Sequence, residues 1–378
     1  MRLSFWERDV LLEADFIVVG AGLIGLQTAL ELRAGAPGAH IIVFERSVLP
    51  DGASSRNAGF ACFGSLTEFL HDLDAMGADA ALALVERRWQ GLARLRARVG
   101  DQALGYEPSG GYDLLDEAHL PALERLDEAN RTIQAVFGDP VFRLDPAALR
   151  QARFGPTARA LVANRREGQL HAGRMMLALA RLAAEAGILV HGGVRVDALE
   201  ETDRAVRLHA SSGADRRALC FRAARVAVCT NGALGELVPD CRVRPVRGQV
   251  LLTEPVADLP WRGSYHMDEG YYYFRNVGNR VLLGGGRNLD FAAEATGETA
   301  LNPRIQHALE RLLHETLLPG RMLRIEDRWA GIMGFAEDKQ PVVRARSPRV
   351  AIGFGCNGMG VALGADIAAR TAALLLEA

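Results

Sequence analysis

Three glycines near the start of the chain have the spacing of a phosphate-binding turn. Gly20, Gly22 and Gly25 form a Gly-x-Gly-x-x-Gly pattern that follows an apolar run. In such a turn the first glycine permits a tight bend, the second lets the backbone approach a pyrophosphate, and the third lets the next helix pack against the strand. The free N–H groups at the start of that helix, around Leu23 and Ile24, then bind the phosphates. The spacing therefore predicts a dinucleotide site.

An acidic residue follows at the distance that ribose recognition requires. A second apolar strand is expected over 40–44, and it ends at Glu45, with Arg46 next in the chain. A carboxylate about twenty residues beyond the glycine turn suits the 2′- and 3′-hydroxyls of an adenosine ribose and repels a 2′-phosphate. A glycine-rich turn in a different α/β fold is the alternative. Strand, turn, helix, strand and acid occur here in the required order, which favours the dinucleotide fold.

A small polar stretch, residues 52–59, is the next segment whose side chains could bind a ligand. It contains Ser54, Ser55, Arg56, Asn57 and Ala58. A serine hydroxyl caps a helix or binds a phosphate, and an arginine neutralises one. An ordinary loop with a helix cap is the alternative. Because the stretch follows a dinucleotide turn, we expect it to contact the ligand.

Two more strands end in polar or glycine-rich turns. The apolar strand 225–229 leads into Thr230, Asn231 and Gly232, and the strand 349–354 leads into Asn357, Gly358, Met359 and Gly360. A final helix is expected over 361–376. Ligands of open α/β sheets bind beyond the carboxyl ends of the strands, where helix N-termini also point. We therefore expect these turns to meet at one edge of a buried parallel sheet.

Composition narrows the function classes. The chain has 378 residues and a formal net charge of −2, which favours neither nucleic acid nor an anionic membrane surface. No apolar stretch approaches the ~18–20 residues of a membrane span, and the acidic residues within 1–15 do not suit a signal peptide, so we expect a cytoplasmic protein. The five cysteines are scattered and show no metal-ligand spacing, so no metal site is expected.

Taken together, the turn at 20–25, the pair Glu45–Arg46 and the stretch 52–59 resemble the D-amino-acid-oxidase-like superfamily of FAD-dependent oxidoreductases, which includes glycine, sarcosine and γ-glutamylputrescine oxidases. The resemblance implies FAD as the cofactor and an α/β FAD-binding Rossmann-like domain of the glutathione-reductase type. It also implies an α+β substrate domain with an antiparallel sheet. The FAD-binding domain would comprise 1–70, 146–235 and 322–378, and the substrate domain 71–145 and 236–321.

The resemblance also implies roles for individual residues. The stretch 52–59 would pass beside the pyrophosphate and the flavin ring, and Val196 would contact the adenine. The turn at 230–232 would lie by the dinucleotide, and Gly331 and the turn 357–360 by the flavin. Monomeric sarcosine oxidases link flavin to a cysteine that has no counterpart between Cys241 and Cys356, and 52–64 contains no histidine, so FAD is expected to bind non-covalently.

The substrate side is expected on a hairpin of strands 271–275 and 280–286. Period-two alternation places Tyr271, Tyr273 and Arg275 on one face, where aromatic rings favour an amine, although plain sheet packing is the alternative. In some amino-acid oxidases of the superfamily an arginine after Trp-x-Gly-Leu holds the substrate carboxylate, whereas Met333 occupies that place here. A carboxylate would then need Arg275 or Arg287.

The expected reaction is oxidation of the C–N bond of a small amine or amino acid, with hydride transfer to the flavin and formation of an imine. This chemistry needs orientation more than an acid–base pair, so no catalytic residue is assigned, and His171 is expected to be structural. The sequence leaves open whether O₂ or another molecule accepts the electrons, and whether the chain forms a homo-oligomer. The alternatives are a flavoprotein subunit active only in a hetero-oligomer and a D-amino-acid dehydrogenase with a non-oxygen acceptor.

Overall fold

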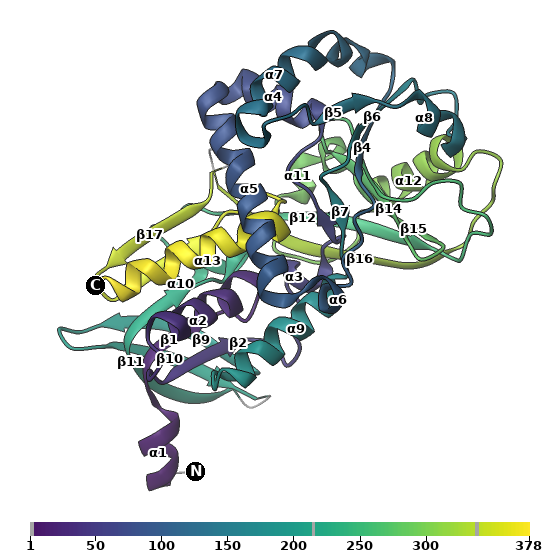
Figure 1. Cartoon of the computed structure of the whole chain (residues 1–378). Helices are drawn as coiled ribbons and strands as arrows, with labels where there is room; N and C mark the ends of the chain where they lie inside the picture. Colours follow the sequence, from purple (N-terminus) through teal and green to yellow (C-terminus); the bar gives the residue numbers. More distant parts are fainter. Residues whose placement is uncertain (1–3, 214–215, 337–339) are drawn as a thin grey trace.

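The computed structural model describes residues 4–213, 216–336 and 340–378, and two large sheets organise it (Figure 1). The strands of the first sheet are β17 (Val342–Ser347), β18 (Val350–Phe354), β11 (Arg217–Val228), β1 (Glu13–Val19), β2 (Ile41–Glu45) and β8 (Leu189–Gly192), in this order. In addition, β10 (Val206–Ser212) pairs with β11, and β9 (Val194–Glu201) pairs with β10. From β18 to β8 neighbouring strands are parallel. The expected parallel sheet is therefore present.

Both faces of this sheet are buried, which explains its apolar strands. Along β1, Phe16 and Val18 pack into one core with the helices, whereas Ile17 and Val19 pack into another with the β9–β10–β11 meander. The helices of the first core are α2 (Leu23–Gly35), α5 (Ala78–Val99), α9 (Ala172–Glu185) and α13 (Gly360–Leu376). Helix α13 packs between α2 and α5, as Figure 1 shows, so the two ends of the chain share one core.

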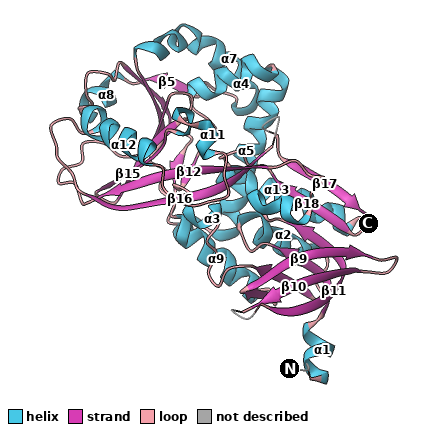
Figure 2. Ribbon diagram, turned by 180° about the vertical axis from the view of Figure 1, so that it is seen from behind, coloured by secondary structure: helices cyan, strands magenta, loops and turns pink. Residues whose placement is uncertain are grey.

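The second sheet is mostly antiparallel. Its order is β16 (Ile325–Phe335), β12 (Arg244–Thr253), β15 (Arg280–Gly285), β14 (Tyr272–Val277), β13 (Ser264–Met267), β4 (Gly111–Leu115), β6 (Ala160–Asn164) and β5 (Phe142–Leu144). Helix α12 (Pro303–Leu312) packs on one part of it, and α4 (Leu66–Met76) and α7 (Leu126–Phe137) pack with α5 on another (Figure 2). A Rossmann-like sheet with a second sheet domain confirms the predicted fold class.

The remaining elements are short. They are α1 (Phe5–Leu11), α3 (Ala53–Arg56), α6 (Asp101–Leu104), α8 (Pro146–Ala152), α10 (Leu234–Leu237) and α11 (Phe291–Glu294), the two-stranded pair β3 (Phe60–Ala61) and β7 (Gly168–Gln169), and the 3-10 or π turns η1 (Glu117–Arg125), η2 (Asn231–Ala233), η3 (Arg287–Leu289) and η4 (Leu313–Leu317). Within the described residues no helix is both long and apolar enough to cross a bilayer.

Some expected boundaries differ from the structure. The apolar spacing over 66–98 is typical of one continuous helix, but the structure divides it into α4 and α5 at Gly77, whose φ of +80° breaks the helix. Strands β6 and β16 both belong to the second sheet, although the segments that contain them, 146–235 and 322–378, were expected to belong to the FAD-binding domain with the first sheet. Strand pairing between distant segments is decided by tertiary contacts, so local pattern does not assign these two strands.

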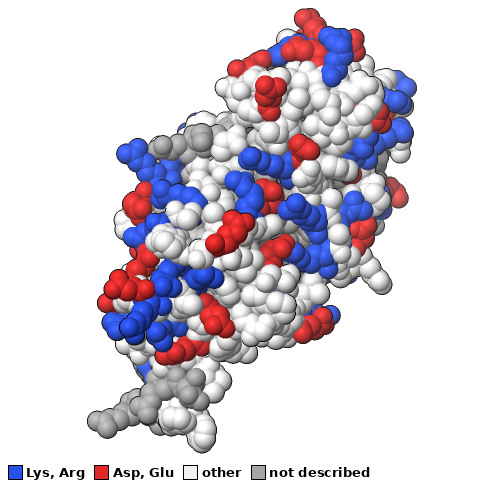
Figure 3. Space-filling model, turned by 60° about the vertical axis from the view of Figure 1, so that its left-hand side comes forward, with Lys and Arg blue, Asp and Glu red and all other residues white. Residues whose placement is uncertain are grey.

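Charge is mixed on the face shown in Figure 3. Acidic and basic side chains lie interspersed across it, without a continuous stripe of one sign. Such a surface matches the near-zero net charge of the chain, −2.

Candidate functional site

A cavity of about 880 Å³ is lined by residues from both sheets. Most of the residues singled out from the sequence line it: Gly20, Gly22, Leu23, Ile24, Glu45, Arg46, Ser54, Arg56, Asn57, Ala58, Val196, Thr230, Asn231, Gly232, Tyr271, Tyr273, Gly331, Met333, Asn357, Gly358, Met359 and Gly360. Gly25, Ser55 and Arg275 do not. The fold thus gathers segments from both ends of the chain around one space.

The glycine turn is shaped by backbone contacts that exclude a side chain. A Cβ at Gly25 would lie 1.8 Å from the carbonyl oxygen of Gly20, so the third glycine lies behind the cavity and lets α2 approach β1. Gly20 has a φ of +102°, and a Cβ there would lie 2.7 Å from the carbonyl oxygen of Cys229. These two positions therefore require glycine, as the dinucleotide turn predicts.

Side chains from two other loops hold this turn in place. The Ser54 hydroxyl accepts the N–H of Leu23 at 2.8 Å and so caps α2 from a distant loop. The Glu45 carboxylate accepts the N–H of Ala21 at 3.1 Å, which leaves it at the end of β2 facing the cavity. Ser55 instead donates its hydroxyl to the carbonyl of Pro50 at 2.6 Å, within its own loop. Ser55 is thus placed away from the cavity.

Hydrogen bonds join three segments that follow strands of the first sheet to β16 of the second sheet and the residue after it. Arg56 donates to the carbonyl of Ala330 at 2.8 Å, and the indole of Trp329 donates to the carbonyl of Arg56 at 2.9 Å. The Asn231 amide oxygen accepts the N–H of Gly334 at 3.0 Å. In the C-terminal turn, the Asn357 amide oxygen accepts the N–H of Ala336 at 2.9 Å. The segments that carry Arg56, Asn231 and Asn357 are therefore all tied to β16 or to the residue that follows it.

The groups around the first sheet fit a dinucleotide. The Gly20–Gly25 turn removes side chains from the approach to α2, and the first N–H groups of α2 have no intrahelical acceptor. The Thr230 hydroxyl oxygen is buried in the cavity wall without a hydrogen-bond partner in the described parts of the chain. Buried polar atoms are normally satisfied, so this hydroxyl fits a bound ligand that would complete it.

The opposite end of the cavity has an aromatic and apolar wall. A Cβ at Gly248 would lie 3.0 Å from the Met333 methyl carbon and 3.9 Å from the Tyr273 hydroxyl, so both side chains converge there. Phe60 meets the Tyr273 ring edge-on, with ring centroids 5.6 Å apart. Burial raises the pKa of Tyr273 to about 12, so its hydroxyl stays protonated and can donate a hydrogen bond.

The two arginines proposed for a carboxylate have different surroundings. Arg275 is 7% exposed and donates to the carbonyls of Gly59 and Leu170, both at 2.8 Å. It supports the backbone beside the cavity, so its expected place in the substrate pocket is wrong. The alternation of side chains along a strand correctly indicates the face of the sheet from which Arg275 projects. The direction of its guanidinium, however, depends on the hydrogen bonds to the two carbonyls. Arg287 does line the cavity, beside Tyr271.

A cluster of paired charges also lines this end, and the sequence analysis missed it. His266 contacts Glu68 at 3.1 Å, His71 contacts Glu269 at 2.9 Å, and Arg88 contacts Asp72 at 3.6 Å. Burial lowers the pKa of His266, but the Glu68 charge outweighs it and holds that pKa well above its usual value. Burial likewise raises the pKa of Glu68, and His266 holds it far below its usual value.

Sequence pattern explains why this cluster was missed. Ser65 and Glu68 form a capping box at the start of α4, a signal that predicts a helix start and gives no partner for the carboxylate. Its partner lies on β13, far away in the chain. His171 is the N-cap of α9, where its ring accepts the N–H of Arg174, as its structural interpretation predicts. No cluster of three or more metal-ligating side chains occurs in the described residues.

Comparison with known proteins gives consistent matches over nearly the whole chain. The family model described as FAD dependent oxidoreductase (DAO) matches residues 15–374. The chain is 26% identical to a "Probable oxidoreductase OrdL" of Rhizobium meliloti (strain 1021), a match that covers 93% of this chain and 80% of the relative.

Solved structures share the fold. Glycine oxidase from Geobacillus kaustophilus superposes with a TM-score of 0.77 at 20% identity and covers 96% of this chain and 95% of its own. An L-amino acid deaminase from Proteus vulgaris superposes with a TM-score of 0.73 at 20% identity, and the match covers 97% of this chain and 90% of the deaminase chain. At this identity the likeness concerns the architecture.

Proposed function

Because the chain belongs to the DAO family of FAD-dependent oxidoreductases and uses FAD as its cofactor, we propose that it oxidises the C–N bond of a small amine or amino acid to an imine. The single observation that carries the proposal is the shared cavity, where the dinucleotide cradle of the first sheet continues into the aromatic wall of the second. Two proteins of the same fold are named for acting on amino acids, a glycine oxidase and an L-amino acid deaminase.

The proposed cofactor residues follow from the geometry of the cradle. The turn 20–25 and the N-terminus of α2 would hold the pyrophosphate, with Ser54 fixing the turn through Leu23. Glu45 would accept the ribose hydroxyls, and Thr230 and the turn 357–360 would complete the site. When bound, FAD accepts the hydride that leaves the substrate carbon.

The chain's own residues would orient the amine and exclude water. Tyr273, Met333 and Phe60 form an apolar wall, which limits hydrolysis until the product leaves. His266 and Glu68 hold each other charged across neutral pH, so neither is poised to take a proton from a substrate ammonium near pH 7. We therefore propose that the amine binds as its free base, and that turnover rises with pH through the pKa of the substrate.

Anaerobic titration of the purified protein tests the proposal. The expected result is a yellow protein, with flavin that acid precipitation releases, whose visible absorbance bleaches on addition of amino acids or amines. Reoxidation by air, compared with an artificial acceptor, then distinguishes an oxidase from a dehydrogenase. A flavoprotein that no amine or amino acid from a broad panel reduces would refute the proposed function and leave FAD binding intact.

A further inference from the structure

Arg287 differs from Arg88 and His266 at the same end of the cavity because its charge has no counterion among the described residues. Within residues 4–213, 216–336 and 340–378 its guanidinium has neither an ion pair nor a hydrogen bond. It packs among aromatic rings, with its central carbon 5.1 Å from the centre of the Tyr271 ring, 5.4 Å from that of Phe291 and 4.8 Å from that of Phe335. The rings hold the guanidinium plane while its N–H groups stay available to a ligand.

The other ionisable side chains at this end already have partners. Arg88 contacts Asp72 and donates to the carbonyl of Phe63, and the two histidines each contact a glutamate. Each carboxylate among these residues already contacts a histidine or an arginine, so a second ammonium group on the substrate, as in a diamine or polyamine, would have to displace one of these partners. A substrate carboxylate, in contrast, would find Arg287, whose pKa is lowered by burial and whose charge is therefore incompletely compensated.

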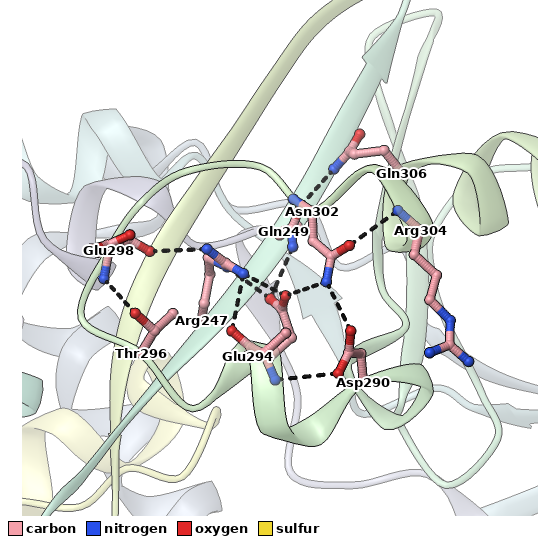
Figure 4. A network of polar contacts seen from close by, with 10 residues as sticks. Arg247, Gln249, Asp290, Glu294, Thr296, Glu298, Asn302, Arg304 and Gln306 are labelled. Atoms are coloured by element: carbon pink, nitrogen blue, oxygen red, sulfur yellow. Dashed lines mark hydrogen bonds and ion pairs between the residues drawn. The ribbon is translucent and has the colours of Figure 1, made fainter.

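A buried network fixes the segment that carries Arg287. Glu294 accepts two hydrogen bonds from Arg247, at 2.9 and 2.7 Å, one from Gln249 at 2.9 Å and one from Asn302 at 3.0 Å (Figure 4). Both members of the ion pair are almost fully buried. The hydrogen bonds of Glu294 therefore fix the segment from η3 to α12 against β12. Arg287, at the start of this segment, is thus held in place before any ligand binds.

We propose that Arg287 binds the carboxylate of the substrate, so that the chain acts on amino acids or N-alkyl amino acids in preference to simple amines. This inference rests on the proposed function. Arg287 of η3 would thus bind the substrate carboxylate, which the uncharged side chain of Met333 cannot bind. A guanidinium is suited to this role because it binds a carboxylate through two parallel hydrogen bonds.

Matched substrate pairs and Arg287 variants of the holoenzyme test the inference. The pairs are glycine with methylamine and sarcosine with dimethylamine, and flavin reduction is followed anaerobically. The wild type should favour the member with a carboxylate. Arg287→Met should weaken its apparent affinity roughly 10- to 100-fold, and Arg287→Lys, which keeps the charge but loses the fork, should fall between. Arg304→Met is the control, because this exposed arginine contacts the network only through its backbone N–H.

A second measurement does not depend on turnover. Acetate should perturb the flavin spectrum of the wild type, and its dissociation constant should rise in Arg287→Met. If Arg287→Met loses FAD, Arg287→Lys decides the matter. Equal reduction by both members of each pair, or unchanged acetate binding in the variants, would overturn the inference while the proposed function stands. A flavin that binds acetate through Arg287 but is reduced by no amine or amino acid would refute only the proposed function.

Discussion

Replacing Glu294 by glutamine should destabilise the protein more than any other isosteric change in the segment that carries Arg287. Glu294 is 1% exposed and accepts four hydrogen bonds, two of them from Arg247, which is 7% exposed. The substitution leaves the Arg247 cation buried without a counterion, and breaking a buried pair in this way costs ~3–5 kcal/mol. With an unfolding entropy near 2.1 cal/mol/K per residue, a chain of 378 residues should lose roughly 4–6 °C in Tm.

Thermal melts of the holoenzyme, followed by circular dichroism and flavin fluorescence, measure this loss. Glu298→Gln is the matched control, because Glu298 lies on the same segment, is exposed, and accepts its hydrogen bond from Arg247 through its backbone carbonyl. It should change stability by at most ~0.5 kcal/mol. The double variant Arg247→Met/Glu294→Leu should recover much of the loss, since apolar side chains leave no unpaired charge. Equal melting of Glu294→Gln and Glu298→Gln would refute the reasoning.

Three further changes test the cradle and the buried charges. Gly25→Ala, whose Cβ would lie 1.8 Å from the Gly20 carbonyl oxygen, should abolish FAD retention, measured as the flavin-to-protein ratio, whereas Gly38→Ala, with no atom within 4 Å, should not. Ser54→Ala removes the cap on Leu23, worth ~1 kcal/mol, and should weaken FAD binding about fivefold by calorimetry. Burial raises the pKa of Glu167 to about 7 from its usual 4.5, so the folded state holds a proton that the unfolded chain releases. Stability should fall as pH rises from about 5 to 7, and Glu167→Gln should remove that slope from pH-dependent melts.

Features set by short-range pattern were predictable from the sequence. The glycine turn, the acid at Glu45 and the final turn each lie beside an apolar run whose length and order indicate a buried parallel strand. Their convergence followed because parallel strands place their carboxyl ends at one edge. The family resemblance added the cofactor, which local chemistry alone does not distinguish from another dinucleotide.

Features set by contacts between distant segments were not predictable. The alternation of β14 put Arg275 on the face of Tyr273, yet its guanidinium turns to the carbonyls of Gly59 and Leu170. The pattern around Glu68 indicates only the start of a helix, yet Glu68 contacts His266 of β13 in the cavity wall. No local pattern encodes either pairing.

The sequence by itself determined which segments bend, which are buried on both faces, and which backbone N–H groups are left for a phosphate, because these depend on residues close together in the chain. Only the tertiary structure decided which charges are neutralised. Arg88 and His266 have counterions while Arg287 has aromatic rings, and this difference arises from how the α4–α5 pair and the second sheet pack around one cavity. An ion pair depends on distance in space, and distance in space is a property of the whole fold.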